Sequence, residues 1–86
     1  MLIYITIYYD TYYPGLGSNG ALSRGNYEVN SHEYTIDPNQ EAARVAKIAC
    51  DKLIRNNLNK VTLRKVIYNE TNDITELVRK LYIGRK

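Results

Sequence analysis

The chain has 86 residues, and a chain of this length forms one small domain, which we place over residues 1–86. It contains no apolar run near the roughly 20 residues that span a bilayer, which excludes a helical membrane protein. The formal net charge is +3, divided into −4 over residues 1–43 and +7 over residues 44–86. With one cysteine and one histidine, the chain can form no intramolecular disulfide and has too few ligands for a zinc site. We therefore expect no metal and no cofactor, and the N-terminus predicts a cytoplasmic protein because it lacks the basic leader of a signal peptide.

The first predicted element is a strand from Leu2 to Tyr9. Its alternating pattern places isoleucines on one face and, apart from Tyr9, tyrosines on the other. We expect the isoleucine face to meet the core, which leaves Tyr4, Thr6 and Tyr8 on the opposite face. Because the strand carries no charge that would protect an edge, we expect it at the centre of the sheet and the protein to be a monomer, with a homodimer as the alternative.

The segment Asp10–Asn26 contains four of the five glycines and has no sustained period, so we expect a long, flexible loop. Gly15, Gly17 and Gly20 spell G-x-G-x-x-G. In dinucleotide folds such glycines open a helix that receives the pyrophosphate, but the residues that follow here are too few and too broken for that helix. The glycines instead indicate positions of positive φ. Whether this segment is a recognition surface, a lid or an ordinary covering loop is left open.

The segment Tyr27–Ile36 begins and ends like a strand but changes phase in the middle. A β-bulge and a tight hairpin both account for the change, and the hairpin is slightly favoured. A helix then begins with Asp37 as N-cap, Pro38 at the first helical position and Gln40 three residues after the cap. Small apolar residues recur along it at helical spacing, so we expect it to pack closely on the isoleucine face and to end near residue 56 or 57.

Val61–Tyr68 is predicted to be a strand, and Arg64 and Lys65 interrupt its alternation, which is typical of an edge or a bulge. The last predicted element is a helix with a capping-box pattern at Asp73 and Glu76. Gly84 is placed to end this helix.

The order of elements predicts an α+β fold. We expect a small three- to four-stranded mixed or antiparallel sheet with two helices on one face, in the order β-(long loop)-β(β)-α-β-α.

Catalytic groups are hard to assemble from this sequence. Cys50 would need His32 as a base, yet it lies on the apolar stripe of the first helix and is expected in the core. Glu28 and Glu33 are expected to be solvated. We therefore expect no enzymatic activity.

Two binding hypotheses remain. The first is a protein or ribonucleoprotein partner, because tyrosine and arginine are enriched among binding hot spots; the candidate residues are Tyr4, Tyr8, Tyr12, Tyr13 and Arg24. The alternative is weak binding of single-stranded DNA or RNA by stacking on strand tyrosines, with bases that contact phosphates; its candidate residues are Tyr4, Tyr8, Arg64, Lys65, Arg79 and Lys80. The chain lacks the glycine–aromatic signature of an RNA-recognition strand, and its net charge is modest for a dedicated phosphate binder.

The run EYTIDPNQEAARVAKIACDKLIRNNLNKVTLRKVIY, residues 33–68, reads as a strand, a capped helix of small residues and a second strand. In size, layout and lack of catalytic motifs it resembles the body of small phage and mobile-element proteins that block host defences, including some anti-CRISPR inhibitors. The resemblance implies a stoichiometric binder that occludes a nucleic-acid-handling complex in the host-cell cytoplasm. It carries over no functional residue, and this basic chain departs from the acidic DNA mimics among those proteins.

Overall fold

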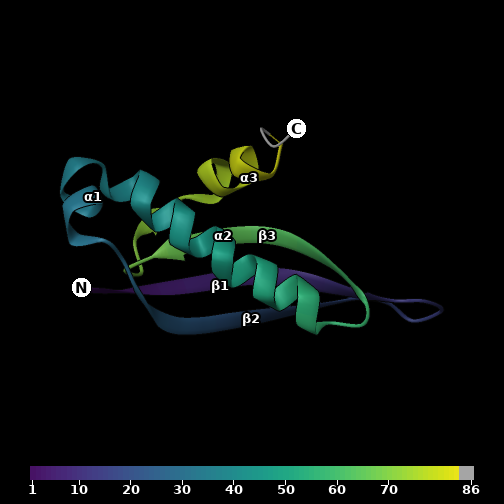
Figure 1. Ribbon diagram of the computed structural model, residues 1–86. Helices are drawn as coiled ribbons and strands as arrows, with labels where there is room; N and C mark the ends of the chain where they lie inside the picture. Colours follow the sequence, from purple (N-terminus) through teal and green to yellow (C-terminus); the bar gives the residue numbers. More distant parts are fainter. Residues whose placement is uncertain (84–86) are drawn as a thin grey trace.

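Within residues 1–83, which are the residues that the computed structural model describes, the chain forms four strands and three helices (Figure 1). In chain order they are β1 (Leu2–Tyr13), β2 (Gly17–Glu28), α1 (Ser31–Ile36), α2 (Pro38–Asn56), β3 (Lys60–Tyr68), β4 (Asn72–Asp73) and α3 (Thr75–Ile83). All strand pairs are antiparallel, in the order β2-β1-β3-β4. The predicted α+β fold class and the central position of the first strand are confirmed.

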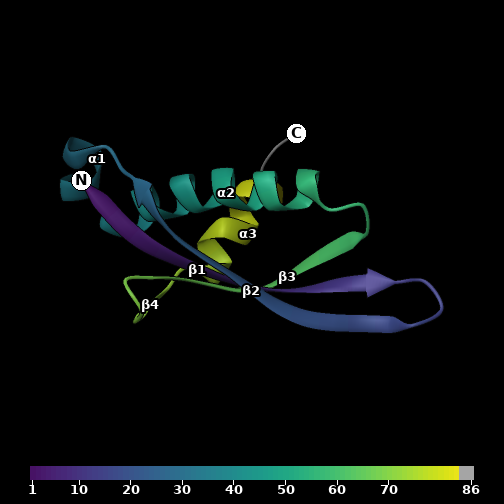
Figure 2. The same ribbon diagram turned by 90° about the horizontal axis from the view of Figure 1, so that it is seen from below.

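The helices lie on one side of the sheet (Figure 2). The isoleucine row of β1 faces them, and Ile3, Ile5 and Ile7 are at most 1% exposed. The buried stripe of α2 consists largely of alanine, and its residues Ala42 and Ala46 are fully buried. Small side chains let a helix lie close to a sheet, so the core is formed between these two rows.

The start and the end of α2 agree with the prediction. The side chain of Asp37 accepts a hydrogen bond from the backbone N–H of Gln40 at 3.2 Å, and Pro38 occupies the first helical position. The helix ends at Asn56. The local capping signal was therefore sufficient to place this helix.

The prediction of a long loop over Asp10–Asn26 is wrong, because β1 continues to Tyr13 and the chain returns as β2 after the turn Pro14–Leu16. The backbone N–H of Leu16 donates to the carbonyl of Tyr13 at 2.9 Å. Gly15 has φ +83°, as the third residue of a type II turn requires. β2 is poor in β-branched and aromatic residues, so pairing with β1 stabilises it and its own sequence gives little sign of a strand.

The prediction of a bulged strand or a hairpin over Tyr27–Ile36 is also wrong. β2 ends at Glu28, and Ser31–Ile36 forms the short helix α1. Asn30 is its N-cap, and the side chain of Asn30 accepts a hydrogen bond from the N–H of Glu33 at 3.0 Å. The change of phase in the sequence marks the passage from strand to helix.

The interruption predicted at Arg64 and Lys65 is a β-bulge. Tyr8 pairs with Lys65 and Tyr9 with Leu63, so Arg64 is the extra residue of β3. The extra residue returns Leu63 to the core face. The bulge therefore accommodates the break in alternation without breaking the sheet.

α3 also lies where it was predicted, but its cap differs. The carboxylate of Asp73 accepts hydrogen bonds from the backbone N–H of Thr75 at 2.9 Å and from its hydroxyl at 2.6 Å. Ile74, which directly precedes α3, and Val78 on the apolar stripe of α3 are at most 1% exposed. The predicted helix end at Gly84 lies outside the described residues.

Candidate binding face

The sheet has one face that no helix covers within residues 1–83, and we call it the open face. It consists of alternate side chains of β1 together with their neighbours on β2 and β3. Its central members are Tyr4, Thr6, Tyr8, Asp10 and Tyr12 of β1, Leu22 and Arg24 of β2, and Arg64, Lys65 and Ile67 of β3.

Three tyrosines form a row along the open face. Tyr4, Tyr8 and Tyr12 are each four residues apart, which corresponds to about 13 Å along a strand. Tyr8 is 37% exposed and Tyr12 is 48% exposed, whereas Tyr4 is half-buried. A tyrosine side chain offers apolar area and a hydroxyl that forms hydrogen bonds, a combination that is frequent in binding surfaces.

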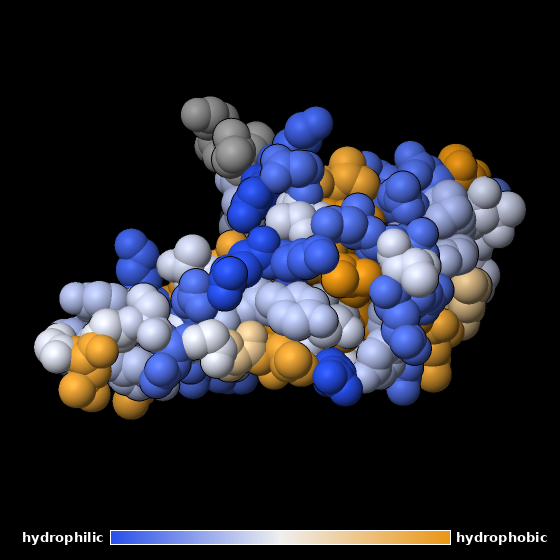
Figure 3. All heavy atoms as spheres, turned by 180° about the vertical axis from the view of Figure 1, so that it is seen from behind, coloured by the Kyte–Doolittle hydropathy of each residue, from blue (hydrophilic) through white to orange (hydrophobic). Residues whose placement is uncertain are grey.

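The strand register sets which side chains lie beside this row. Thr6 lies between Arg24 of β2 and Ile67 of β3, and Tyr8 lies between Leu22 and Lys65. Figure 3 views the molecule from the side opposite the helices and shows hydrophobic and hydrophilic residues interspersed across it. The face is therefore amphipathic and does not form one continuous apolar patch.

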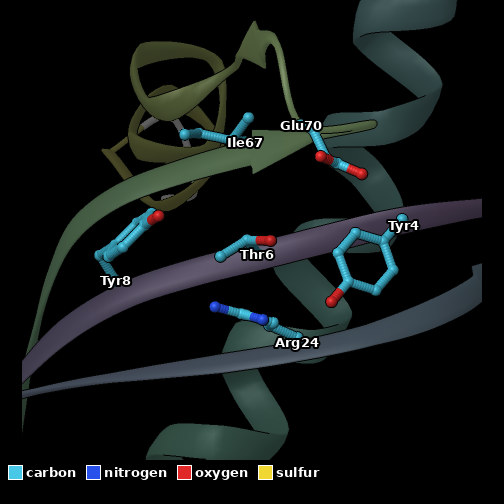
Figure 4. Close-up of a pocket in the computed structure, with 6 residues that line it drawn as sticks. All are labelled: Tyr4, Thr6, Tyr8, Arg24, Ile67 and Glu70. Atoms are coloured by element: carbon cyan, nitrogen blue, oxygen red, sulfur yellow. The ribbon is translucent and has the colours of Figure 1, made fainter.

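A shallow depression of about 350 Å³ lies on the open face (Figure 4). Its lining residues come from three segments and are Tyr4, Thr6, Tyr8, Arg24, Ile67 and Glu70. In Figure 4, the carboxylate of Glu70 lies near Tyr4, and the guanidinium of Arg24 extends toward the half that contains Tyr8. The depression thus has an acidic half and a basic half.

Ion pairs neutralise some of the charges around this face. Arg64 lies 3.6 Å from Asp10, and the N-terminal ammonium lies 2.6 Å from Glu28. Among residues 1–83, no ion pair involves Arg24, Lys65 or Glu70. Arg24 and Glu70 are therefore available to a partner, whereas hydrogen bonds from Thr75 and, to a smaller extent, the charge of Lys65 lower the pKa of Asp73.

The predicted protein-binding residues are only partly brought together. Tyr4, Tyr8 and Arg24 line the same depression, and Tyr12 lies further along the same face. Tyr13 follows Tyr12 directly, so strand alternation turns its side chain to the face that carries the helices. Tyr12 and Tyr13 therefore lie on opposite faces of the sheet and do not share one binding surface.

The predicted nucleic-acid-binding residues are divided between the two sides of the sheet. Lys65 lies beside Tyr8, but Arg79 and Lys80 belong to α3, on the side of the helices. Arg79 is also engaged, because its guanidinium pairs with Glu76 at 2.8 Å and donates to the carbonyl of Arg64 at 3.5 Å. The tyrosine row therefore shares its face with fewer bases than the sequence suggested.

Sequence reasoning missed two members of this surface, Ile67 and Glu70. Leu22, which the sequence placed in a long loop as part of a candidate recognition surface or lid, is 43% exposed on β2. Ile67 was predicted in a strand, but its place in the depression follows from its pairing with Thr6. Glu70 has no local sequence signal, because it reaches the site through the tertiary position of its turn.

The described residues contain no cluster of three or more histidine, cysteine, aspartate or glutamate side chains that could hold a metal ion. Cys50 is fully buried, and burial raises the pKa of its thiol to about 12, with the charge of Asp51 as a smaller cause. His32 is exposed on α1. A protonated, inaccessible thiol is not a nucleophile, so Cys50 is a core group.

Comparison of the chain with protein-family models, with curated proteins and with solved structures gives no match. In the part of the chain that the structure describes, no helix has both the length and the apolar character needed to cross a membrane.

Proposed function

We propose that the protein is a non-enzymatic binding protein that recognises a larger protein or ribonucleoprotein complex through its open face. The observation that carries the proposal is the tyrosine row of β1, which runs along an uncovered sheet with Leu22, Arg24 and Lys65 beside it. Aromatic and arginine side chains provide most of the binding energy in protein interfaces. A four-stranded sheet backed by helices holds such side chains in fixed positions, which lowers the entropic cost of binding.

The composition of the face favours a protein surface as the partner over a phosphate backbone. The open face mixes acids with bases, since Asp10 lies 3.6 Å from Arg64 and Glu70 lines the same depression as Arg24. Carboxylates repel phosphates, and the bases of α2 and α3 lie on the side of the helices. Exposed apolar area at Tyr12 is suited to packing against another protein.

The proposed mode of action is stoichiometric inhibition in the cytoplasm, in the manner of the anti-CRISPR-like proteins that the chain resembles. This part rests on the resemblance in size and layout and on the predicted lack of catalytic groups. An inhibitor of this kind needs only a rigid surface that covers a functional site of its target. A monomer with one binding face meets that need.

The experiment that tests the proposal is affinity capture from the native cell. The tagged wild type is compared with a variant in which Tyr8 and Tyr12 are replaced by alanine, and with an Ile54→Ala control. Ile54 is 40% exposed on α2, so the control removes exposed apolar area from another element. We expect a partner retained in a fixed ratio by the wild type and the control, and lost by the open-face variant. Equal retention by all three proteins would contradict the proposal.

The alternative function, binding of single-stranded DNA or RNA, is favoured by one observation: Lys65 lies beside Tyr8, and Arg24 lines the same depression as Tyr8. Stacking on tyrosine and phosphate contacts would then act together. This alternative predicts that a labelled oligonucleotide binds at low salt and is released steeply as the salt concentration rises. We expect no binding of the oligonucleotide.

A further inference from the structure

Glu70 lies at the rim of the depression in a backbone conformation that disfavours any side chain. Its φ is +69°, and the preceding Asn69 has φ +50°. Among L-residues, asparagine tolerates this left-handed region best, while glycine is preferred at the second of two such positions in a hairpin turn. A glutamate at this place therefore lowers the stability of the fold relative to glycine.

The same turn is held firmly against β1. The backbone N–H of Asn69 donates to the carbonyl of Tyr4 at 2.7 Å, and the backbone N–H of Tyr4 donates to the side-chain oxygen of Asn69 at 3.1 Å. The second bond, to the side chain, explains why residue 69 is asparagine. Both bonds also fix the position of Glu70 beside the ring of Tyr4.

No such structural explanation exists for the glutamate. Among the described residues, no hydrogen bond or ion pair involves its carboxylate, and the side chain is exposed. Residues held in strained backbone conformations are concentrated at functional sites. Three separate observations thus concern Glu70. Its backbone is strained, its turn is fixed to β1, and its carboxylate is unpaired at the rim of a depression lined by tyrosines.

We propose that Tyr4 and Glu70 form an anchoring site for a basic side chain, an arginine or a lysine, of the protein partner. A guanidinium or ammonium group placed here contacts the face of the Tyr4 ring and pairs with the carboxylate of Glu70. Arg24 at the basic half of the depression, with Lys65 beside Tyr8, then faces an acidic residue of the same partner. This inference rests on the proposed function, because it names the chemistry that the open face recognises.

The first arm of the test measures stability. Glu70→Gly removes the strained side chain, so we expect a higher melting temperature than that of the wild type. Glu70→Gln keeps the strain and removes the charge, so its melting temperature stays unchanged. A melting temperature of Glu70→Gly equal to or below that of the wild type would overturn the argument from strain.

The second arm measures recognition with a displayed library of short random peptides. Peptides are kept if they bind the wild type and fail to bind Tyr8→Ala, which selects ligands of the open face. We expect these peptides to be enriched in arginine or lysine, and their affinity to fall about tenfold on both Glu70→Gln and Glu70→Gly. Glu33→Gln, which removes an exposed carboxylate from α1, is the matched control and leaves binding unchanged.

The outcomes separate this inference from the proposed function. Open-face peptides without basic residues, or with equal affinity for Glu70→Gln, would overturn the inference and leave the proposed function standing. Recovery of no open-face peptide would overturn both. A labelled single-stranded oligonucleotide that binds the wild type, and binds Glu70→Gln more tightly, would assign the depression to phosphate and also overturn the inference.

Discussion

The buried carboxylate of Glu41 is held by the guanidinium of Arg44, one turn further along α2. The two residues form hydrogen bonds of 2.8 and 2.6 Å, and Glu41 is 4% exposed. The same carboxylate accepts the backbone N–H of Asn30 at 2.7 Å, which ties the N-cap of α1 to α2. These contacts connect the start of α1 to the first turn of α2.

These contacts predict a pH dependence of stability. The hydrogen bond from Arg44 lowers the pKa of Glu41 from 4.5 to about 2, although burial opposes the shift. A carboxyl group whose pKa is lower in the folded state stabilises the protein above its unfolded pKa, and this contribution is lost as the pH falls toward about 2. Glu41→Gln should therefore lower the free energy of unfolding by about 1–3 kcal/mol at neutral pH. In urea unfolding at several pH values, the difference from the wild type should shrink below about pH 4.5; a constant difference would contradict this account.

The hairpin turn predicts that replacing two glycines by alanine will have different effects on stability. Gly15 has φ +83°, so Gly15→Ala should lower the free energy of unfolding by about 1–2 kcal/mol although its Cβ would meet no atom within 4 Å. Gly20 lies inside β2, and the nearest atom to an added Cβ is a carboxylate oxygen of Asp10 at 3.5 Å. Gly20→Ala should therefore change stability by less than about 0.5 kcal/mol. Equal effects in thermal melts would mean that the segment is a flexible loop after all.

The open face predicts that its aromatic residues contribute little to folding. Tyr12→Ala should change the free energy of unfolding by less than about 1 kcal/mol, because the side chain is 48% exposed. Ile5→Ala on the opposite face of the same strand should cost about 2–5 kcal/mol, because Ile5 is fully buried. Denaturant titrations of the two variants give the comparison. A large loss for Tyr12→Ala would place that ring in the core and remove it from the binding surface.

The edges of the sheet predict the oligomeric state. β1 is paired on both sides, so it cannot join a second copy by strand pairing. The edge strand β2 carries charged side chains at Arg24 and Glu28, and the bulge at Arg64 distorts the outer edge of β3. Both features disfavour strand pairing with a second copy. We expect light scattering to give a mass near 9.9 kDa. A mass of twice that value would contradict the expected monomer.

The elements that the sequence predicted correctly are those in which one local signal dominates. The capping residues before Gln40 placed the start of α2, and the isoleucine row of β1 placed the core. The break in alternation at Arg64 and Lys65 indicated an edge or a bulge, and the strand register shows a bulge at Arg64. In each case the sequence signal lies within a few residues of the chain.

The elements that were missed depend on interactions between distant residues. β2 is a strand because β1 supplies its hydrogen bonds, and its glycines and serines suggested a loop. Of the site, the sequence identified Tyr4, Tyr8 and Arg24, which the register brings into one depression. Glu70 lies 66 positions after Tyr4 and reaches the depression because Asn69 bonds to the backbone of Tyr4. No local pattern encodes such a contact.

The most direct test of the central claim is site-specific photo-crosslinking in the native cell. A photoreactive amino acid is placed at Tyr8 on the open face or, as the control, at Ile54 on α2. We expect one dominant crosslinked protein from position 8 and none from position 54. Crosslinking of the partner from position 54 alone, or of nucleic acid from position 8, would contradict the claim.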